Sequence, residues 1–124
     1  MVNFSRVQPE TDAQVAFLRL VLPGRPECNV GVFLLHQATG SLYFRLREDW
    51  DRLAEAEEAE LLSQLSHDFR NRIQELGEKG GQAFLESLED QLSNVLQLTG
   101  RTSLKVGDVR AAIDRLFEEN CTTA

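Results

Sequence analysis

The most constraining feature of the sequence is the stretch over residues 27–35 (Glu-Cys-Asn-Val-Gly-Val-Phe-Leu-Leu), the most apolar run of the chain. It is too short for an independent helix and contains the β-branched residues Val30 and Val32, so it is typical of a strand buried on both faces. Gly31 interrupts the run, and a glycine inside a strand indicates a bulge or a close approach by another group. We therefore predict a central strand over about residues 28–36.

Strand patterns flank this central strand on both sides. Residues 15–22 form an apolar run that only Arg19 interrupts, and residues 23–26 (Pro-Gly-Arg-Pro) are a strong turn signal. Residues 41–47 alternate between two faces. These faces carry Leu42, Phe44 and Leu46 on one side and Tyr43, Arg45 and Arg47 on the other. The three strands together predict an antiparallel meander.

The sequence pattern becomes helical from about residue 49. Asp49 and Asp108 are predicted N-caps, because a short side chain there accepts bonds from the first free N–H groups. Three helices with apolar stripes at three- and four-residue spacing are expected over residues 55–76, 82–93 and about 109–117. Residues 95–106 contain one late extended segment that Gly100 interrupts.

Because the strands precede most of the helices, we predict an α+β fold. Its expected form is an antiparallel three-stranded meander plus one late strand, with three helices packed on one face. One shared core is expected to contain Val32, Leu34, Phe44, Leu65, Phe69 and Leu116.

The chain length of 124 residues is typical of a single domain. We place this domain at residues 13–120, after a loose lead-in over residues 1–12 and before a polar tail over residues 121–124. The N-terminal segment lacks an apolar signal core, and no run approaches the ~20 apolar residues of a membrane span. The lack of such a run predicts no membrane association. Two cysteines make no disulfide framework, which favours a reducing cytoplasm.

The charge balance bears on the class of partner. The formal net charge is −7, whereas nucleic-acid binding draws mainly on lysine and arginine. The sequence therefore argues against nucleic-acid binding, which stays a weaker alternative through a local arginine stripe.

No catalytic or metal-binding pattern stands out. His36 and His67 have no third ligand at a metal-binding spacing, and the carboxylates within residues 48–51 suit a helix start. The Ser-His-Asp grouping within residues 63–68 lies on a predicted helix without a strained turn. Residues 77–81 follow a helix, whereas a phosphate-binding loop precedes one. We therefore assign no catalytic residue, no metal and no cofactor.

A candidate binding site comprises six polar residues near the central strand. These are Arg19, Glu27, Asn29, Tyr43, Arg45 and Arg47. In one interpretation they form an open pocket on the sheet, since arginine forks bind carboxylates and phosphates. In the other they are structural: Arg19, Glu27 and Asn29 satisfy one another in a buried network, while Arg45 and Arg47 pair with Glu48 and Asp51.

Two ends of the chain carry a family resemblance. Residues 18–23 (Leu-Arg-Leu-Val-Leu-Pro) and 27–32 (Glu-Cys-Asn-Val-Gly-Val) resemble the opening of an uncharacterised bacterial domain family, although Leu20 stands where that family usually has an aromatic residue. Residues 96–98 and 113–117 are similar to its closing strand and helix. The resemblance implies a bacterial protein with no assigned reaction, from a family whose members are sometimes encoded beside kinase-like proteins of the toxin–antitoxin type.

These observations favour a non-enzymatic interaction or accessory module in the cytoplasm. Its partner would be another protein, which the resemblance suggests is kinase-like, and a homodimer is left open. The alternative is an enzyme or ligand-binding domain for an anionic or phosphorylated substrate, acting through Arg19, Arg45 and Arg47. A concave pocket that held Glu27, Asn29 and the arginines would favour this alternative, whereas a flat apolar patch would favour the interaction module.

Overall fold

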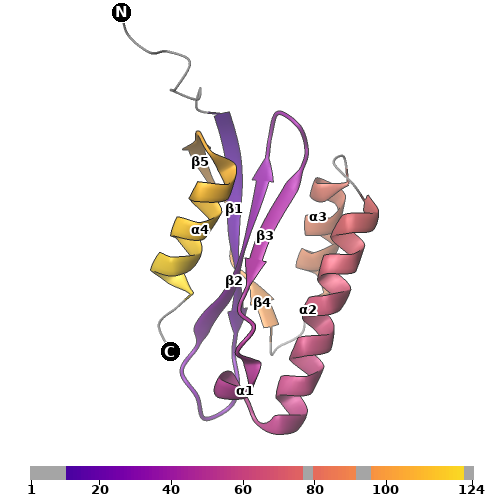
Figure 1. Ribbon diagram of the computed structural model, residues 1–124, viewed down its shortest axis with the longest axis vertical. Coiled ribbons are helices and arrows are strands. Elements are labelled where there is room, and N and C mark those ends of the chain that lie inside the picture. The colour runs from indigo at the N-terminus through magenta and orange to yellow at the C-terminus, as the bar shows by residue number, and fades with distance from the viewer. Residues whose placement is uncertain (1–10, 77–79, 92–95, 122–124) are drawn as a thin grey trace, which may run out of the picture.

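The computed structural model describes residues 11–76, 80–91 and 96–121. In this part the chain forms five strands and four helices, arranged as a twisted sheet with helices on both sides (Figure 1). The elements are β1 (Thr11–Leu20), β2 (Cys28–His36), β3 (Leu42–Leu46), α1 (Trp50–Leu53), α2 (Ala56–Leu76), α3 (Gly81–Gln91), β4 (Leu96–Leu98), β5 (Thr102–Val106) and α4 (Val109–Asn120). The predicted α+β class is confirmed.

The sheet is built on β1 and β2. Its strand order is β3-β2-β1-β4, and β5 also pairs with β1. The pairs β1–β2 and β2–β3 are both antiparallel, which confirms the predicted meander. The central strand begins at Cys28 and ends at His36, as the sequence predicts.

The prediction of one late strand is wrong, because two late strands share the same edge of β1. β5 pairs with Thr11–Val15 and β4 pairs with Leu18–Leu20. Between them, Thr99 N–H donates to Phe17 O (2.9 Å) and Phe17 N–H donates to Thr99 Oγ1 (2.8 Å). β1 is long enough to hold both because it begins at Thr11, four residues before the predicted start.

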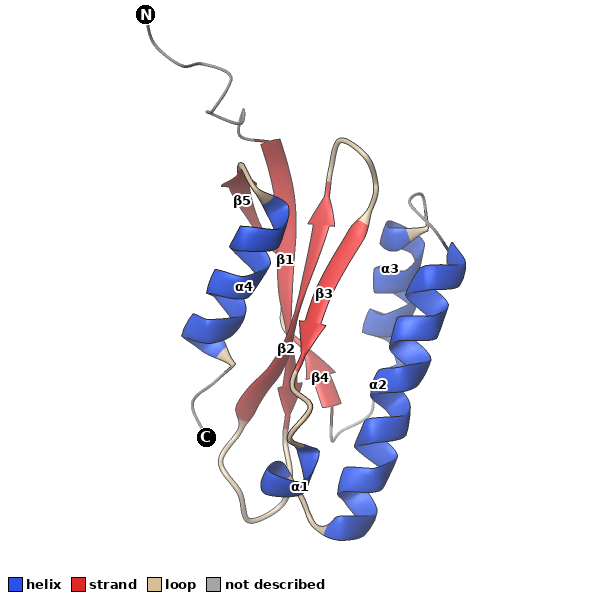
Figure 2. Cartoon of the chain, in the orientation of Figure 1, coloured by secondary structure: helices blue, strands red, loops and turns tan. Residues whose placement is uncertain are grey.

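The prediction that three helices cover one face is also wrong. Figure 2 shows α2 and α3 on one side of the sheet and α4 on the other. The cause lies in β2, which is apolar on both faces and needs cover on both. Phe33 and Leu35 belong to the core cluster that contains the buried residues of α2 and α3, whereas Val32 and Leu34 belong to the cluster with α4.

The six residues expected in one shared core are accordingly divided between two clusters. Phe44, Leu65 and Phe69 lie in or against the cluster with α2 and α3, and Val32, Leu34 and Leu116 lie in or against the cluster with α4. Each predicted residue packs in a core, but no single core contains them all.

Gly31 shows both features that a glycine in a strand indicates. Leu18 pairs with Gly31 while Arg19 pairs with Asn29, so Val30 has no partner on β1 and forms a bulge. A Cβ atom at Gly31 would collide with the side chain of Leu46. The bulge lies directly beside the Arg19–Asn29 pair, at the end of the sheet where the candidate site is found.

Candidate functional site

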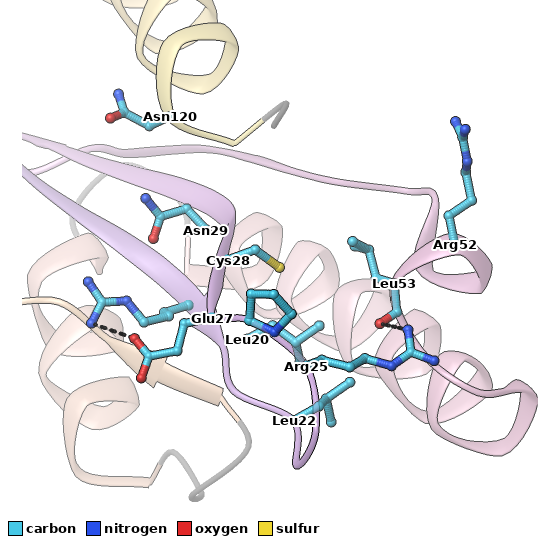
Figure 3. A pocket seen from close by; sticks show the side chains of 11 residues that line it. Leu20, Leu22, Arg25, Glu27, Cys28, Asn29, Arg52, Leu53 and Asn120 are labelled. Carbon is cyan, nitrogen blue, oxygen red and sulfur yellow. Dashed lines mark hydrogen bonds and ion pairs between the residues drawn. The ribbon is translucent and has the colours of Figure 1, made fainter. Parts of the chain in front are cut away.

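A groove of about 610 Å³ opens at the end of the sheet where β1 leads into β2 (Figure 3). β1 and β2, the loop between them, α1 and the end of α4 all contribute to its wall. The lining residues are Arg19, Leu20, Leu22, Arg25, Pro26, Glu27, Cys28, Asn29, Arg52, Leu53 and Asn120. Three of the six predicted site residues, Arg19, Glu27 and Asn29, therefore lie together in a concave site.

These three residues do not form the buried network that the structural interpretation requires. Arg19 Nη1 lies 3.7 Å from Glu27 Oε2, and the two side chains are 39% and 59% exposed. An exposed ion pair of this length contributes about 0–1 kcal/mol to stability. The Asn29 side chain is half-buried and makes no hydrogen bond to the described residues. Stability therefore does not explain why polar side chains occupy these positions.

Arginine dominates the charge of the groove. Arg25 Nη1 donates to Leu53 O (2.8 Å) and Arg25 Nη2 to Glu55 Oε1 (3.2 Å), which ties the β1–β2 loop to the end of α1. Arg52 is exposed and makes no side-chain hydrogen bond or ion pair within the described part of the chain. Three arginines thus line this groove against one lining carboxylate, Glu27, although Figure 3 shows the Arg52 side chain extending away from Cys28 and Asn29.

Cys28 supplies the one thiol that lines the groove, and thiols serve as nucleophiles in enzymes. Figure 3 shows Glu27 on one side of Cys28 and the Arg25 guanidinium, beside Leu53, on the other. Burial raises the pKa of the Cys28 thiol above its ordinary value, although Arg47 acts in the opposite direction. Since the thiolate is the reactive form, Cys28 is a weak nucleophile at neutral pH.

The other three predicted residues lie elsewhere, so the predicted six-residue pocket is divided. Tyr43 packs against the core cluster with α4. Arg45 Nη1 lies 3.0 Å from Asp114 Oδ1, and its guanidinium sits 4.2 Å from the centre of the Phe117 ring. Arg45 therefore joins β3 to α4, and it is Asp114, not Glu48 or Asp51, that neutralises it.

Arg47 is a structural residue. Its side chain is 9% exposed, and its Nε and Nη2 atoms donate to the two oxygens of Asp49 (2.9 and 2.6 Å). Its Nη1 donates to Cys121 O (3.0 Å), immediately after α4. The hydrogen bonds from Arg47 lower the pKa of Asp49. Because both Asp49 oxygens accept from Arg47, the side chain does not cap α1, contrary to the prediction from the sequence. The predicted cap at Asp108 is confirmed, since its carboxylate accepts from two N–H groups of α4.

Among the groove residues that were not predicted from the sequence, three have charged or amide side chains: Arg25, Arg52 and Asn120. Arg25 lies within the Pro-Gly-Arg-Pro turn, and a turn joining two paired strands necessarily lies at the end of the sheet. Arg52 follows the predicted cap at Asp49, so its proximity depends on where α1 packs. Asn120 reaches the groove only because α4 crosses the face opposite α2 and α3, which the sequence pattern did not indicate.

The described residues contain no group of three or more His, Cys, Asp or Glu side chains that could hold a metal ion. His36 instead makes hydrogen bonds to Thr11 Oγ1 (2.7 Å) and Thr39 Oγ1 (3.0 Å). None of the helices in residues 11–76, 80–91 and 96–121 combines the length and apolar character that crossing a membrane requires.

Comparison with known proteins places the chain in a family. The family model described as "Protein of unknown function (DUF3037)" matches residues 24–120, which include the groove residues from Arg25 to Asn120 but not Arg19. No curated protein and no solved structure gives a significant match. The resemblance to an uncharacterised domain family is confirmed at that level. Because the match covers most of the sequence, the chain belongs to the DUF3037 family of proteins of unknown function.

Proposed function

We propose that this domain is a non-enzymatic binding module that takes an anionic group of a partner protein into the groove between the β1–β2 loop and α1. The anionic group is a carboxylate or a phosphate on an acidic segment. The observation that carries the proposal is that three arginines and only one carboxylate line the groove, in a chain whose net charge is −7.

The arrangement of donors suits an anion. Arg52 makes no side-chain hydrogen bond or ion pair to the described residues and has only an electrostatic interaction with Asp49, so its guanidinium is available to a ligand. Arg19 is held only by a 3.7 Å contact with Glu27, and Asn29 adds an amide that bonds to nothing else in the described part. A guanidinium presents a planar fork of donors that matches the oxygens of carboxylates and phosphates.

Binding is favoured over catalysis by the groove's own side chains. Burial raises the pKa of the Cys28 thiol, which disfavours the thiolate, and neither described histidine lines the groove to act as its base. A nucleophile without an adjacent base or a lowered pKa is poorly activated.

A small anionic or phosphorylated ligand is a second candidate, which the shape of the groove favours. Its volume of about 610 Å³ lies within the roughly 300–1,000 Å³ typical of small-ligand sites. Leu61 is the one large apolar side chain that the described part exposes, so this part offers no flat apolar patch. The groove holds Glu27, Asn29 and Arg19 but not Arg45 or Arg47, so its concave shape supports ligand binding with only part of the predicted residues.

The test is a binding titration with two probes. A fluorescently labelled hexaglutamate peptide, followed by anisotropy, represents the acidic segment, and inorganic phosphate, followed by calorimetry, represents the small anion. Arg52→Gln should weaken peptide binding roughly tenfold, since a charged hydrogen bond contributes about 1.5–3 kcal/mol. Binding of phosphate alone would support the second candidate.

The matched control is Arg72→Gln on α2, which removes the same charge from an exposed residue that lines none of the described grooves. This variant should bind the peptide as the wild type does. Equal weakening by both variants would show that only net charge matters, and failure of the wild type to bind either probe would contradict the proposal.

A further inference from the structure

The outer edge of β3 is free of any neighbouring strand in the described part of the chain. β3 ends the strand order β3-β2-β1-β4. Two hydrogen bonds define how it meets β2: Arg47 N–H donates to Val30 O (2.8 Å), and His36 N–H donates to Ser41 O (2.9 Å). These bonds determine which residues of β3 direct their backbone N–H and C=O groups toward β2 and which direct them away from it.

Bonded and non-bonded pairs alternate along an antiparallel ladder. Because residues 41 and 47 bond to β2, Tyr43 and Arg45 also bond to it, in the register that pairs them with Leu34 and Val32. The backbone N–H and C=O groups of Phe44 and Leu46 therefore point away from β2. No described residue bonds to them.

One end of this edge is already covered. A Cβ atom at Gly81, the first residue of α3, would lie 2.9 Å from Leu42 N, so α3 begins directly against the start of β3. The open part of the edge is the segment from Phe44 to Leu46. Figure 1 shows this edge between α2 and α4.

Grooves flank the open segment. One of about 310 Å³ lies between β3 and α4 and includes Tyr43 and Arg110. Another of about 620 Å³ runs from Phe44 to Asp49 and includes Arg70 of α2 and Phe117 of α4. An added strand projects alternate side chains to opposite faces of a sheet. Backbone pairing with β3 would thus place those side chains in space that the protein leaves open.

The charge of these grooves selects the kind of strand. Their three carboxylates are already paired: Asp114 with Arg45 (3.0 Å), Asp49 with Arg47 (2.6 Å) and Glu48 with Arg70 (2.7 Å). Arg52 and Arg110 also line these grooves, and neither makes a side-chain bond within the described residues. The surplus of charge beside the edge is therefore positive.

We propose that the β3 edge is a strand-addition site for an extended acidic segment of a partner protein. The backbone of that segment pairs with Phe44 and Leu46, and its acidic side chains meet Arg110 and Arg52. Main-chain pairing supplies affinity in such complexes, while the flanking grooves supply specificity. A second copy of this chain fits less well. If two β3 edges paired antiparallel with the two Phe44 residues opposite each other, Leu46 of one copy would lie opposite Leu42 of the other, where α3 already covers the edge.

The test uses a capped peptide of alternating glutamate and valine, six residues long. Amide hydrogen exchange measured by NMR should slow at Phe44 and Leu46 when the peptide binds, and should not change at Tyr43 and Arg45. Only every second residue of an added strand directs its N–H group toward β3. Methylating the backbone nitrogens of those residues should weaken binding at least tenfold, whereas methylating the nitrogens of the intervening residues should not. Arg110→Gln should weaken binding several-fold, whereas Arg72→Gln should not.

Three outcomes would overturn the proposal. Equal effects of the two methylation patterns would show that backbone pairing is not involved. Protection of the groove near Asn29 without protection at Phe44 and Leu46 would place the peptide in the other site. A dimer of the domain alone, dissociated by the peptide in sedimentation, would assign the edge to a second copy.

Discussion

Two sets of arginines that look alike in the sequence occupy opposite situations in the structure. Arg45 and Arg47 on and after β3 are engaged with Asp114 and Asp49, and Arg47 is almost completely buried. Arg19 and Arg52, at the groove, are exposed and are loosely paired or unpaired among the described residues. The sets differ in how firmly they are paired, since the side chains of Arg45 and Arg19 are similarly exposed (42% and 39%) but lie 3.0 and 3.7 Å from their carboxylates.

The comparison of the two sets indicates that the role of an arginine depends on the distance to its partners and on how buried the pair is. Arg47 donates to Asp49 at 2.6 and 2.9 Å and to Cys121 O at 3.0 Å, and its side chain is only 9% exposed, so little of its guanidinium can reach a ligand. A contact at 3.7 Å between exposed groups is weak enough for a ligand to displace. Conservative changes in the two regions should therefore separate stability from binding.

The largest expected effect is on stability, from Arg47→Ala. This change leaves Asp49 and the Cys121 carbonyl without their partner, and breaking a buried ion pair costs about 3 kcal/mol or more. Urea unfolding followed by circular dichroism measures the change in the free energy of unfolding. Arg45→Ala, two residues earlier in the chain, is the control. Because the Arg45 side chain is 42% exposed, its loss should cost less than about 1.5 kcal/mol. Equal costs for the two variants would contradict the assigned difference.

A smaller effect should appear in the pH dependence of stability. The hydrogen bonds from Arg47 lower the pKa of Asp49 below its ordinary 3.8 in the folded state. A carboxyl group of this kind contributes stability that is present above its unfolded pKa and is lost as the pH falls through its folded pKa. Asp49→Asn should therefore be less stable than the wild type at pH 6, and the gap should narrow below about pH 4.

A double-mutant cycle can test whether Arg47 is the group that stabilises the Asp49 carboxylate. In an Arg47→Ala background, the further change Asp49→Asn should alter the free energy of unfolding by much less than it does in the wild type. A full-sized effect in that background would show that Asp49 is stabilised by some other group.

The smallest effect on stability is expected at the groove. Asn29→Ala and Glu27→Gln remove side chains that bond weakly or not at all to the described residues, so each should change the free energy of unfolding by less than about 0.5 kcal/mol. Thermal melting followed by calorimetry is the measurement. A loss of about 2 kcal/mol or more would restore the interpretation of these residues as a structural network.

Much of the fold could be predicted from local pattern. The bounds of β2 follow from its apolar run, and the cap at Asp108 from its position before an amphipathic stretch. The placement of α4 could not be predicted, because the buried faces of β2 demand cover without specifying which helix supplies it. The division of the late segment into β4 and β5 depends on the length of β1 and on the bonds between Phe17 and Thr99.

The candidate site was predictable only in part, for a related reason. Arg19, Glu27 and Asn29 meet because neighbouring antiparallel strands place residues near their shared turn together. Arg45 and Arg47 were grouped with them from strand alternation alone. Their engagement with Asp114 and with the carbonyl of Cys121 depends on α4, which lies far along the chain.

The most direct test of the difference between the two sets of arginines is an NMR titration that observes the side-chain Nε–Hε signals while hexaglutamate is added. The account predicts that the signals of Arg19 and Arg52 shift in a saturable manner while that of Arg47 stays in place. Movement of Arg47 with no response from Arg19 and Arg52, or a uniform small drift of every exposed arginine, would contradict it.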